Sequence, residues 1–219
     1  MADGGSKATV APQRAERAAL CDLLLERGPG APTLCEGWRT AELATHLVVR
    51  ERKPLAGPGL VMGGAAARLT ARIMAHTQAS CTYEQMVARV RSGPPPWTAP
   101  FDALINLTEY FVHHEDVRRG GGDPTPRPAE ERRAVESALW HRLRRGAGFM
   151  TRPVKGIGLD LVTTDGDTIT ACRGAGRATL TGTPGEIVLF LSGRGEAAHV
   201  EIGGHSEAAA ALRAAHFGL

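Results

Sequence analysis

The chain has 219 residues, of which 42% are hydrophobic and only 5% aromatic. A chain of this length can bury an ordinary core, either as one domain or as two small ones. Its formal net charge of +3 comes from 26 basic and 23 acidic residues that are interleaved along the sequence. Nucleic-acid-binding proteins carry a clustered basic face, and membrane-spanning proteins carry long apolar runs. We therefore expect neither nucleic acid nor a membrane as a partner.

The cysteines and the N-terminus indicate the compartment. Cys21, Cys35, Cys81 and Cys172 are far apart and form no C-x-x-C pair, which predicts neither a zinc ribbon nor a disulfide framework. The first 13 residues lack the apolar stretch of a secretory signal. We expect a cytoplasmic protein in a reducing environment.

Residues 1–150 are expected to form a bundle of helices. Apolar residues recur at helical spacing and are interrupted by segments rich in Gly and Pro, which end helices. The expected helices are Ala11 to Arg27, a helix from an N-cap at Thr40 to the residues before Pro54, a third helix from Ala65 to Thr77 that continues, with or without a break, from Thr82 to Arg91, and helices over Phe101 to Arg119 and Ala129 to Arg145.

Past Gly146 the pattern changes to that of a small α+β domain, over residues 151–219. Polar and apolar residues alternate on both sides of Asp165-Gly166, which predicts a β-hairpin. Further strands are expected at residues 177–181 and 199–202, with a short helix at residues 186–191 and a closing helix from a cap at Ser206 to Ala215. The fold class is therefore mainly α, with the domain boundary between residues 146 and 156.

The most informative residues are Glu109, His113 and Asp116, which share one face of a predicted helix. Side chains four residues apart on a helix are neighbours, so a carboxylate and an imidazole at this spacing can hold one divalent cation together. Exposed Glu–His pairs have the same spacing, so a metal site needs a third ligand. His46 is the best candidate, because it shares a helical stripe with leucines and faces the interior, although a core histidine would look the same.

Two histidines and one carboxylate are the ligand set of catalytic zinc, which keeps a coordination position open. The same set also suits non-haem iron. Asp116 either orients a ligand imidazole, as metal-binding histidines require, or is a surface acid. His114 points about 100° away from His113 on a helix, so we expect it to be structural or peripheral.

Several short motifs occur in an order and spacing that resemble the mycothiol-dependent maleylpyruvate isomerase family. The N-terminal motifs are Thr33-Leu-Cys35-Glu-Gly37-Trp38, Glu42-Leu43-x-x-His46-Leu47 and Glu109-x3-His113-x2-Asp116, and the C-terminal ones are Thr164-Asp-Gly-Asp167, Gly182-x-Pro184-x-Glu186 to Gly193-Arg194, and Val200-x-Ile202-x-Gly204. The resemblance implies a DinB-like four-helix bundle followed by a small α+β domain. It also implies that His46, Glu109 and His113 are the metal ligands.

The resemblance further implies a divalent metal, with zinc as first choice and nickel as second, and a low-molecular-weight thiol such as mycothiol. A metal-bound thiol is deprotonated and becomes a nucleophile at neutral pH. The thiolate would then add to, or be transferred to, a small electrophilic substrate. Residues 54–97 show no alignable motif, and the sequence assigns no further catalytic residue. Arg50 and Arg194 could contact an anion, although their positions fit exposed structural arginines better.

Three functional classes stay open. We favour a thiol-dependent transferase or isomerase. A non-catalytic metal-binding protein, acting as a sensor or binding module, is the first alternative, and an iron oxygenase with the same ligands is the second. Either a monomer or a homodimer fits the sequence. We also expect the C-terminal domain to close the pocket, using Gly193-Arg194 and His205.

Overall fold

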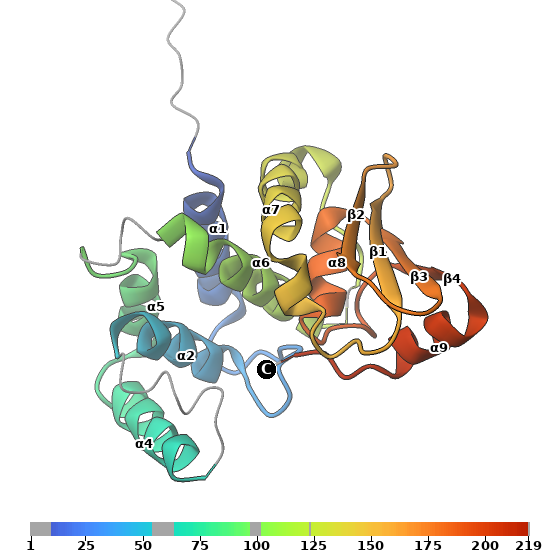
Figure 1. Cartoon of the computed structure of the whole chain (residues 1–219). Coiled ribbons are helices and arrows are strands. Elements are labelled where there is room, and N and C mark those ends of the chain that lie inside the picture. Colours follow the sequence, from blue (N-terminus) through green and yellow to red (C-terminus); the bar gives the residue numbers. More distant parts are fainter. Residues whose placement is uncertain (1–9, 54–63, 97–101, 123, 219) are drawn as a thin grey trace, which may run out of the picture.

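The computed structural model describes residues 10–53, 64–96, 102–122 and 124–218. Its N-terminal two thirds are helical, and its C-terminal third combines helices with a sheet (Figure 1). The helices before the sheet are α1 (Pro12–Arg27), α2 (Thr40–Arg52), α4 (Ala65–Ala79), α5 (Tyr83–Arg91), α6 (Asp102–Gly120) and α7 (Ala129–Met150). The sequence therefore predicted each of these helices in the right place, with ends that differ by a few residues.

Local signals in the sequence explain where the helices begin and end. α1 starts with Pro12, whose missing N–H costs nothing in the first turn, and Gly28 ends it with a positive φ of 72°. α5 is capped by Thr82, which accepts a hydrogen bond from the backbone N–H of Gln85. At α2 the prediction was wrong by one residue. Arg39 is the N-cap, and the Glu42 carboxylate accepts from its backbone N–H at 3.0 Å.

The C-terminal third contains a mixed four-stranded sheet in the order β2-β1-β3-β4. Its strands are β1 (Gly158–Thr163), β2 (Thr168–Cys172), β3 (Arg177–Gly182) and β4 (Glu201–Gly204), and its helices are α8 (Pro184–Leu191) and α9 (Ser206–Ala214). β1 and β2 form the predicted antiparallel hairpin, whereas β1 and β3 are parallel and β3 and β4 antiparallel. β4 starts two residues later than predicted, because the backbone N–H of His199 bonds to the Glu186 carboxylate at 2.7 Å instead of to a strand.

The buried apolar side chains form two clusters that meet along α6. Side chains of α1, α2 and α5 make the first, and α6 adds Tyr110 and Val117 to it. The second consists of the sheet, α8, α9 and α7, and α6 adds Leu107, Phe111 and Val112. The chain is therefore mainly α with a small mixed sheet, and α7 shares its core with that sheet. The four-helix bundle and the division at residue 150 remain predictions.

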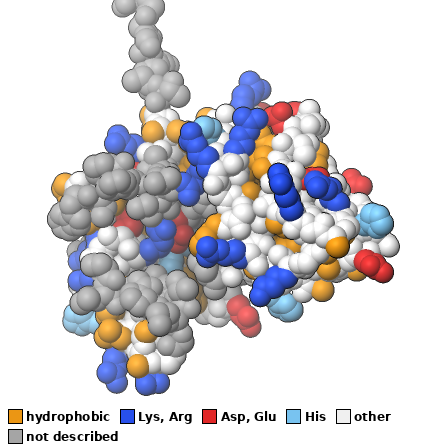
Figure 2. All heavy atoms as spheres, viewed as in Figure 1, with side chains coloured by type: hydrophobic (Ala, Val, Ile, Leu, Met, Phe, Trp, Pro, Cys, Tyr) orange, Lys and Arg blue, Asp and Glu red, His pale blue; other side chains and the backbone are white. Residues whose placement is uncertain are grey.

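The charged side chains on the face shown in Figure 2 are of both signs. Lys and Arg side chains are scattered there and are separated by uncharged atoms. In the described part of the chain, no helix combines the length and the apolar character needed to cross a bilayer.

Because α6 contributes to both apolar clusters, it is the central element of the molecule. Its polar side chains form the site described next.

Candidate metal centre

The structure brings the three predicted ligands together. His46 extends from α2, and Glu109 and His113 extend from successive turns of α6. The Nε2 atom of His46 lies 3.1 Å from Oε1 of Glu109, and the Nε2 atom of His113 lies 3.2 Å from the same oxygen. One ligand atom from each residue lies within 4.8 Å of the other two.

This geometry fits a divalent ion. Zinc binds imidazole nitrogen and carboxylate oxygen at about 2.0 to 2.2 Å, so neighbouring ligand atoms of a tetrahedral site are about 3.3 Å apart. The two distances to Glu109 Oε1, 3.1 and 3.2 Å, are close to that value. Three protein ligands leave one tetrahedral position for another molecule.

Glu109 is the charged centre of this group. Burial favours the neutral acid, but hydrogen bonds from His113 and His46 and the charge of Arg50 outweigh it and hold the pKa of Glu109 well below its usual value. Arg50 Nε lies 3.1 Å from Glu109 Oε1, and the Arg50 side chain is only 22% exposed. The prediction that Arg50 is an exposed structural arginine was therefore wrong, because α2 directs its side chain, like that of His46, to Glu109 on α6.

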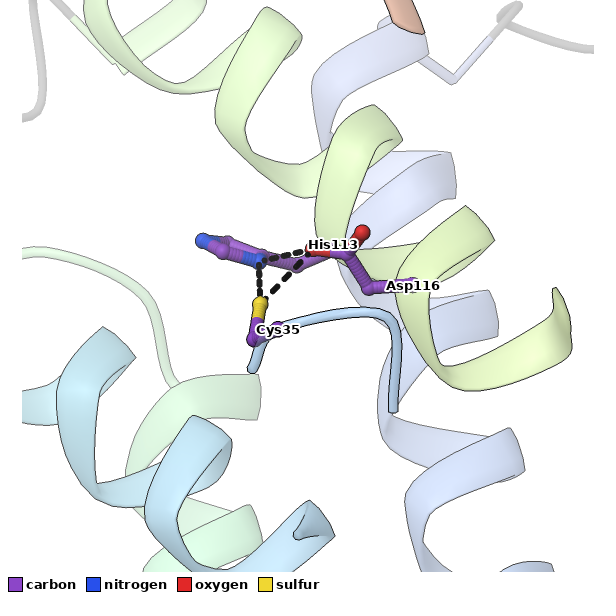
Figure 3. Close-up of side chains that lie close together, drawn as sticks. All are labelled: Cys35, His113 and Asp116. Atoms are coloured by element: carbon purple, nitrogen blue, oxygen red, sulfur yellow. Dashed lines mark hydrogen bonds and ion pairs between the residues drawn. The ribbon is translucent and has the colours of Figure 1, made fainter. Parts of the chain in front are cut away.

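His113 is anchored on its other ring nitrogen. Its Nδ1 atom lies 2.8 Å from Oδ2 of Asp116, whose side chain is fully buried (Figure 3). Two roles were predicted for Asp116. The prediction of a surface acid is wrong, and the position of Asp116 fits an acceptor that orients the His113 imidazole. Burial disfavours the imidazolium, but hydrogen bonds to Asp116, Cys35 and Glu109 outweigh it and raise the pKa of His113 well above its usual value.

Two further residues contact Asp116. The sequence assigned no role at the site to Cys35, and for Arg194 it favoured an exposed structural arginine over an anion contact, which was wrong. The Cys35 thiol lies 3.1 Å from Asp116 Oδ2, and Figure 3 shows it reaching the site from the loop before α2. Arg194, in the segment after α8, donates from Nε to Oδ1 at 2.9 Å and from Nη2 to Oδ2 at 2.7 Å. Both residues lie in the motifs that carry the family resemblance. That was the available signal, but nothing in the sequence paired them with Asp116.

The ring of His46 is supported differently. Its Nδ1 atom is buried without a hydrogen-bond partner among the described residues. The Trp38 ring packs against it instead, with centroids 5.0 Å apart and an interplanar angle of 47°. Burial, together with the charges of His113 and Arg50, lowers the pKa of His46 despite its bond to Glu109. The two imidazoles are therefore shifted in opposite directions.

Backbone contacts hold the loop that carries Cys35 and Trp38 against α6. The N–H of Leu34 donates to the carbonyl of Asp116 at 3.1 Å. At the end of α6, Gly120 approaches the loop so closely that a Cβ atom there would lie 2.4 Å from Thr33 Cα. The loop can reach Asp116 because residue 120 has no side chain.

Of the remaining sequence-predicted residues, His114 and His205 lie outside this group. His114 is buried, with Nδ1 2.9 Å from a carboxylate oxygen of Glu16 on α1, which fits the structural role expected for it. Of the two residues expected to close the pocket, Arg194 reaches the site. His205 is exposed at the start of α9, where its backbone N–H donates to the carbonyl of Arg177 at 2.8 Å.

Comparison with solved structures connects this fold to one enzyme. The chain is similar to the crystal structure of the mycothiol-dependent maleylpyruvate isomerase, with a TM-score of 0.56, 17% identity, and coverage of 87% of this chain and 90% of that one. A variant of that enzyme with one histidine replaced by alanine gives a TM-score of 0.59 at 16% identity and the same coverage. No family model matches the chain, and no curated protein matches its sequence. At this identity the likeness shows the fold alone.

Proposed function

We propose that the protein is a metal-dependent enzyme that uses a low-molecular-weight thiol as the nucleophile in a transfer or isomerisation on a small electrophilic substrate. His46, Glu109 and His113 would hold the ion, with zinc as first choice and nickel as second. The observation that carries the proposal is the convergence of two imidazole Nε2 atoms on one carboxylate oxygen, at 3.1 and 3.2 Å. Mycothiol as the thiol and the cytoplasm as the compartment belong to the same proposal.

The charges around the site favour an anionic ligand such as a thiolate. The carboxylates of Glu109 and Asp116 are balanced by the guanidinium groups of Arg50 and Arg194. A divalent ion therefore adds uncompensated positive charge, and it supplies the chemistry that makes a thiol, with a usual pKa of about 8.5, into a thiolate at neutral pH.

The residues around the ligands have separate tasks in this proposal. Asp116 accepts from His113 Nδ1 and so leaves Nε2 for the ion. Trp38 packs on His46 and limits the orientation of that ring. Cys35 is a poor alternative nucleophile, because the nearest imidazole nitrogen, His113 Nδ1 at 3.9 Å, is already bonded to Asp116. The nucleophile would thus come from the small thiol. Its sulfur, after losing its proton, would form a bond to the electrophilic carbon while the π bond at that carbon opens or a leaving group departs with the bonding electron pair.

Metal content and thiol binding test the proposal. The protein should bind about one zinc ion per chain, and Glu109→Ala should lower that affinity by at least about 100-fold, because it removes the charged ligand. Glu130→Ala is the matched control, since Glu130 is exposed at the start of α7. His114→Ala is a poor control, because His114 is buried against Glu16.

Cobalt substitution then separates an enzyme from a non-catalytic metal-binding protein, the alternative that the same ligands suit. Titration of the cobalt protein with mycothiol or another small thiol should give a thiolate-to-metal charge-transfer band, and incubation with the thiol and a generic electrophile should consume the thiol. Metal binding without either result would replace the enzyme with the sensor or binding module. No metal binding by the unaltered protein would refute both.

A further inference from the structure

Arg194 connects the sheet-containing part of the chain to the candidate metal centre. It follows α8, whose side chains lie in the apolar cluster with the sheet, whereas the three proposed ligands lie on α2 and α6. Its guanidinium group makes two parallel hydrogen bonds to the Asp116 carboxylate, at 2.9 and 2.7 Å. Paired bonds of this kind fix the plane of a carboxylate as well as its position.

The backbone around α8 holds the guanidinium group in place. Arg194 Nη1 donates to the carbonyl of Ser192 at 2.6 Å, and its backbone N–H donates to the carbonyl of Leu189 at 3.0 Å. Its Nη2 atom also lies 3.3 Å from the Cys35 sulfur. The position of Arg194 is therefore set by the C-terminal part of the chain and by the loop before α2.

Asp116 transmits this position to the ligand ring. Its Oδ2 atom accepts hydrogen bonds from His113 Nδ1 at 2.8 Å, from the Cys35 thiol at 3.1 Å and from Arg194 Nη2 at 2.7 Å. The side chain is fully buried, so water does not compete for its oxygens. An imidazole whose Nδ1 is held this way has its Nε2 atom directed at Glu109.

We propose that Arg194 is a positioning residue, which fixes the His113 ring through Asp116 and thereby sets the metal affinity of a site whose ligands lie on other elements. This inference rests on the proposed metal centre and goes beyond it, because it assigns control of that centre to the C-terminal part of the chain. Residues that orient metal-binding histidines typically change metal affinity by about 10- to 100-fold when they are replaced.

A purely structural ion pair between α6 and the segment after α8 is the competing explanation. It predicts that replacing Arg194 lowers thermal stability and leaves the zinc affinity of the folded protein unchanged. Zinc affinity, measured by competition with a chelator on protein shown to be folded by circular dichroism, distinguishes the two. The cobalt absorption spectrum is a second readout, because it responds to ligand geometry and not to stability.

Arg194→Gln should weaken zinc binding by about 10- to 100-fold and change the cobalt spectrum, since it removes both parallel bonds. Arg194→Lys keeps the charge but not the planar fork, so its effect should be intermediate. Lysine also provides a milder variant if glutamine prevents folding. Arg133→Gln, at an exposed position of α7, is the matched control and should bind zinc like the unaltered protein.

A double-mutant cycle tests whether Arg194 acts through Asp116. If it does, Asp116→Asn combined with Arg194→Gln should weaken zinc binding no more than Asp116→Asn alone, because coupled residues are not additive. Zinc affinity of Arg194→Gln within about twofold of the unaltered protein, or full additivity in the cycle, would overturn the positioning role. Failure of the unaltered protein to bind either zinc or nickel would overturn the metal centre itself, which keeps the two proposals distinguishable.

Discussion

The two imidazoles that face Glu109 are held by very different surroundings. On the α6 side, His113 is fixed at both nitrogens, by Glu109 and by the buried carboxylate of Asp116. On the α2 side, His46 bonds to Glu109 through one nitrogen and has no partner for the other among the described residues. An aromatic ring, that of Trp38, supplies its remaining support.

The difference teaches that one half of the candidate centre is rigid and the other adjustable. A ring held by charge-assisted hydrogen bonds cannot rotate without leaving a buried charge unpaired, which is costly. A ring held by one bond and by packing can rotate at lower cost. The metal-binding geometry would therefore be set from α6, and His46 would adapt to the ion. The pKa values of the two rings differ in the same sense, because that of His113 is raised and that of His46 is lowered.

The largest expected effect comes from removing each ring in turn. In metal-free protein, His113→Ala should cost about 3 to 5 kcal/mol of unfolding free energy, because a buried charged partner of Asp116 and Glu109 is lost. His46→Ala should cost about 1 to 2 kcal/mol, since it removes one hydrogen bond and some packing. Urea unfolding monitored by circular dichroism gives both values. Equal costs would show that the asymmetry described above does not exist.

A smaller effect on the unfolding free energy should appear when the pH is lowered. The pKa of Asp116 is lowered to about 2 from a usual 3.8: burial alone would raise it, and the His113 and Arg194 hydrogen bonds and charges outweigh that effect. A group whose pKa falls on folding binds fewer protons in the folded state, so its contribution of about 2 kcal/mol is present above pH 4 and is lost as pH falls toward 2.

Asp116→Asn removes this titration and is the variant that tests it. Its unfolding free energy should lie below that of the unaltered protein at pH 6, and the gap should narrow between pH 4 and the lowest pH at which both still fold. Urea unfolding across this range measures the gap. A gap that stays constant with pH would contradict the assignment of the low pKa to Asp116.

The smallest effect concerns protons released on metal binding. The raised pKa of His113 keeps that ring protonated near neutral pH in metal-free protein, whereas the lowered pKa leaves His46 neutral. Zinc requires both nitrogens without protons, so binding should release about one proton at pH 7 and gain up to about tenfold in affinity per pH unit. Calorimetry in buffers of different ionisation enthalpy counts the protons. Release of two, or of none, would mean that the rings titrate alike.

Much of this molecule could be predicted from sequence, because its elements follow local rules. Helical spacing and Gly or Pro interruptions placed the long helices, and alternation around Asp165-Gly166 placed the hairpin. The proposed ligands were identified because Glu109 and His113 are neighbours on one helix, where distance follows from spacing. His46 lies on a different helix. Its flanking leucines indicated that its side chain faces another helix in the interior.

What the sequence could not supply were contacts between distant segments. Cys35 and Arg194 are 159 residues apart, yet they meet at Asp116. Their meeting depends on how α8 packs on the rest of the core and on the docking of a loop, and neither leaves a periodic signal. Arg50 was misjudged for the same reason, because its burial depends on which face of α2 lies against α6.

The close approach at Gly120 makes the site depend on a residue that carries no functional group. Any β-carbon there would overlap the backbone of residues 32 and 33, and the loop would have to leave α6. Cys35 and Trp38 would move with it, away from Asp116 and His46. In a mutational survey, position 120 would therefore score like a catalytic residue, although no atom of it contacts the chemistry. A functional map based on sensitivity to substitution would place the candidate metal centre too far along α6 unless this packing constraint is taken into account.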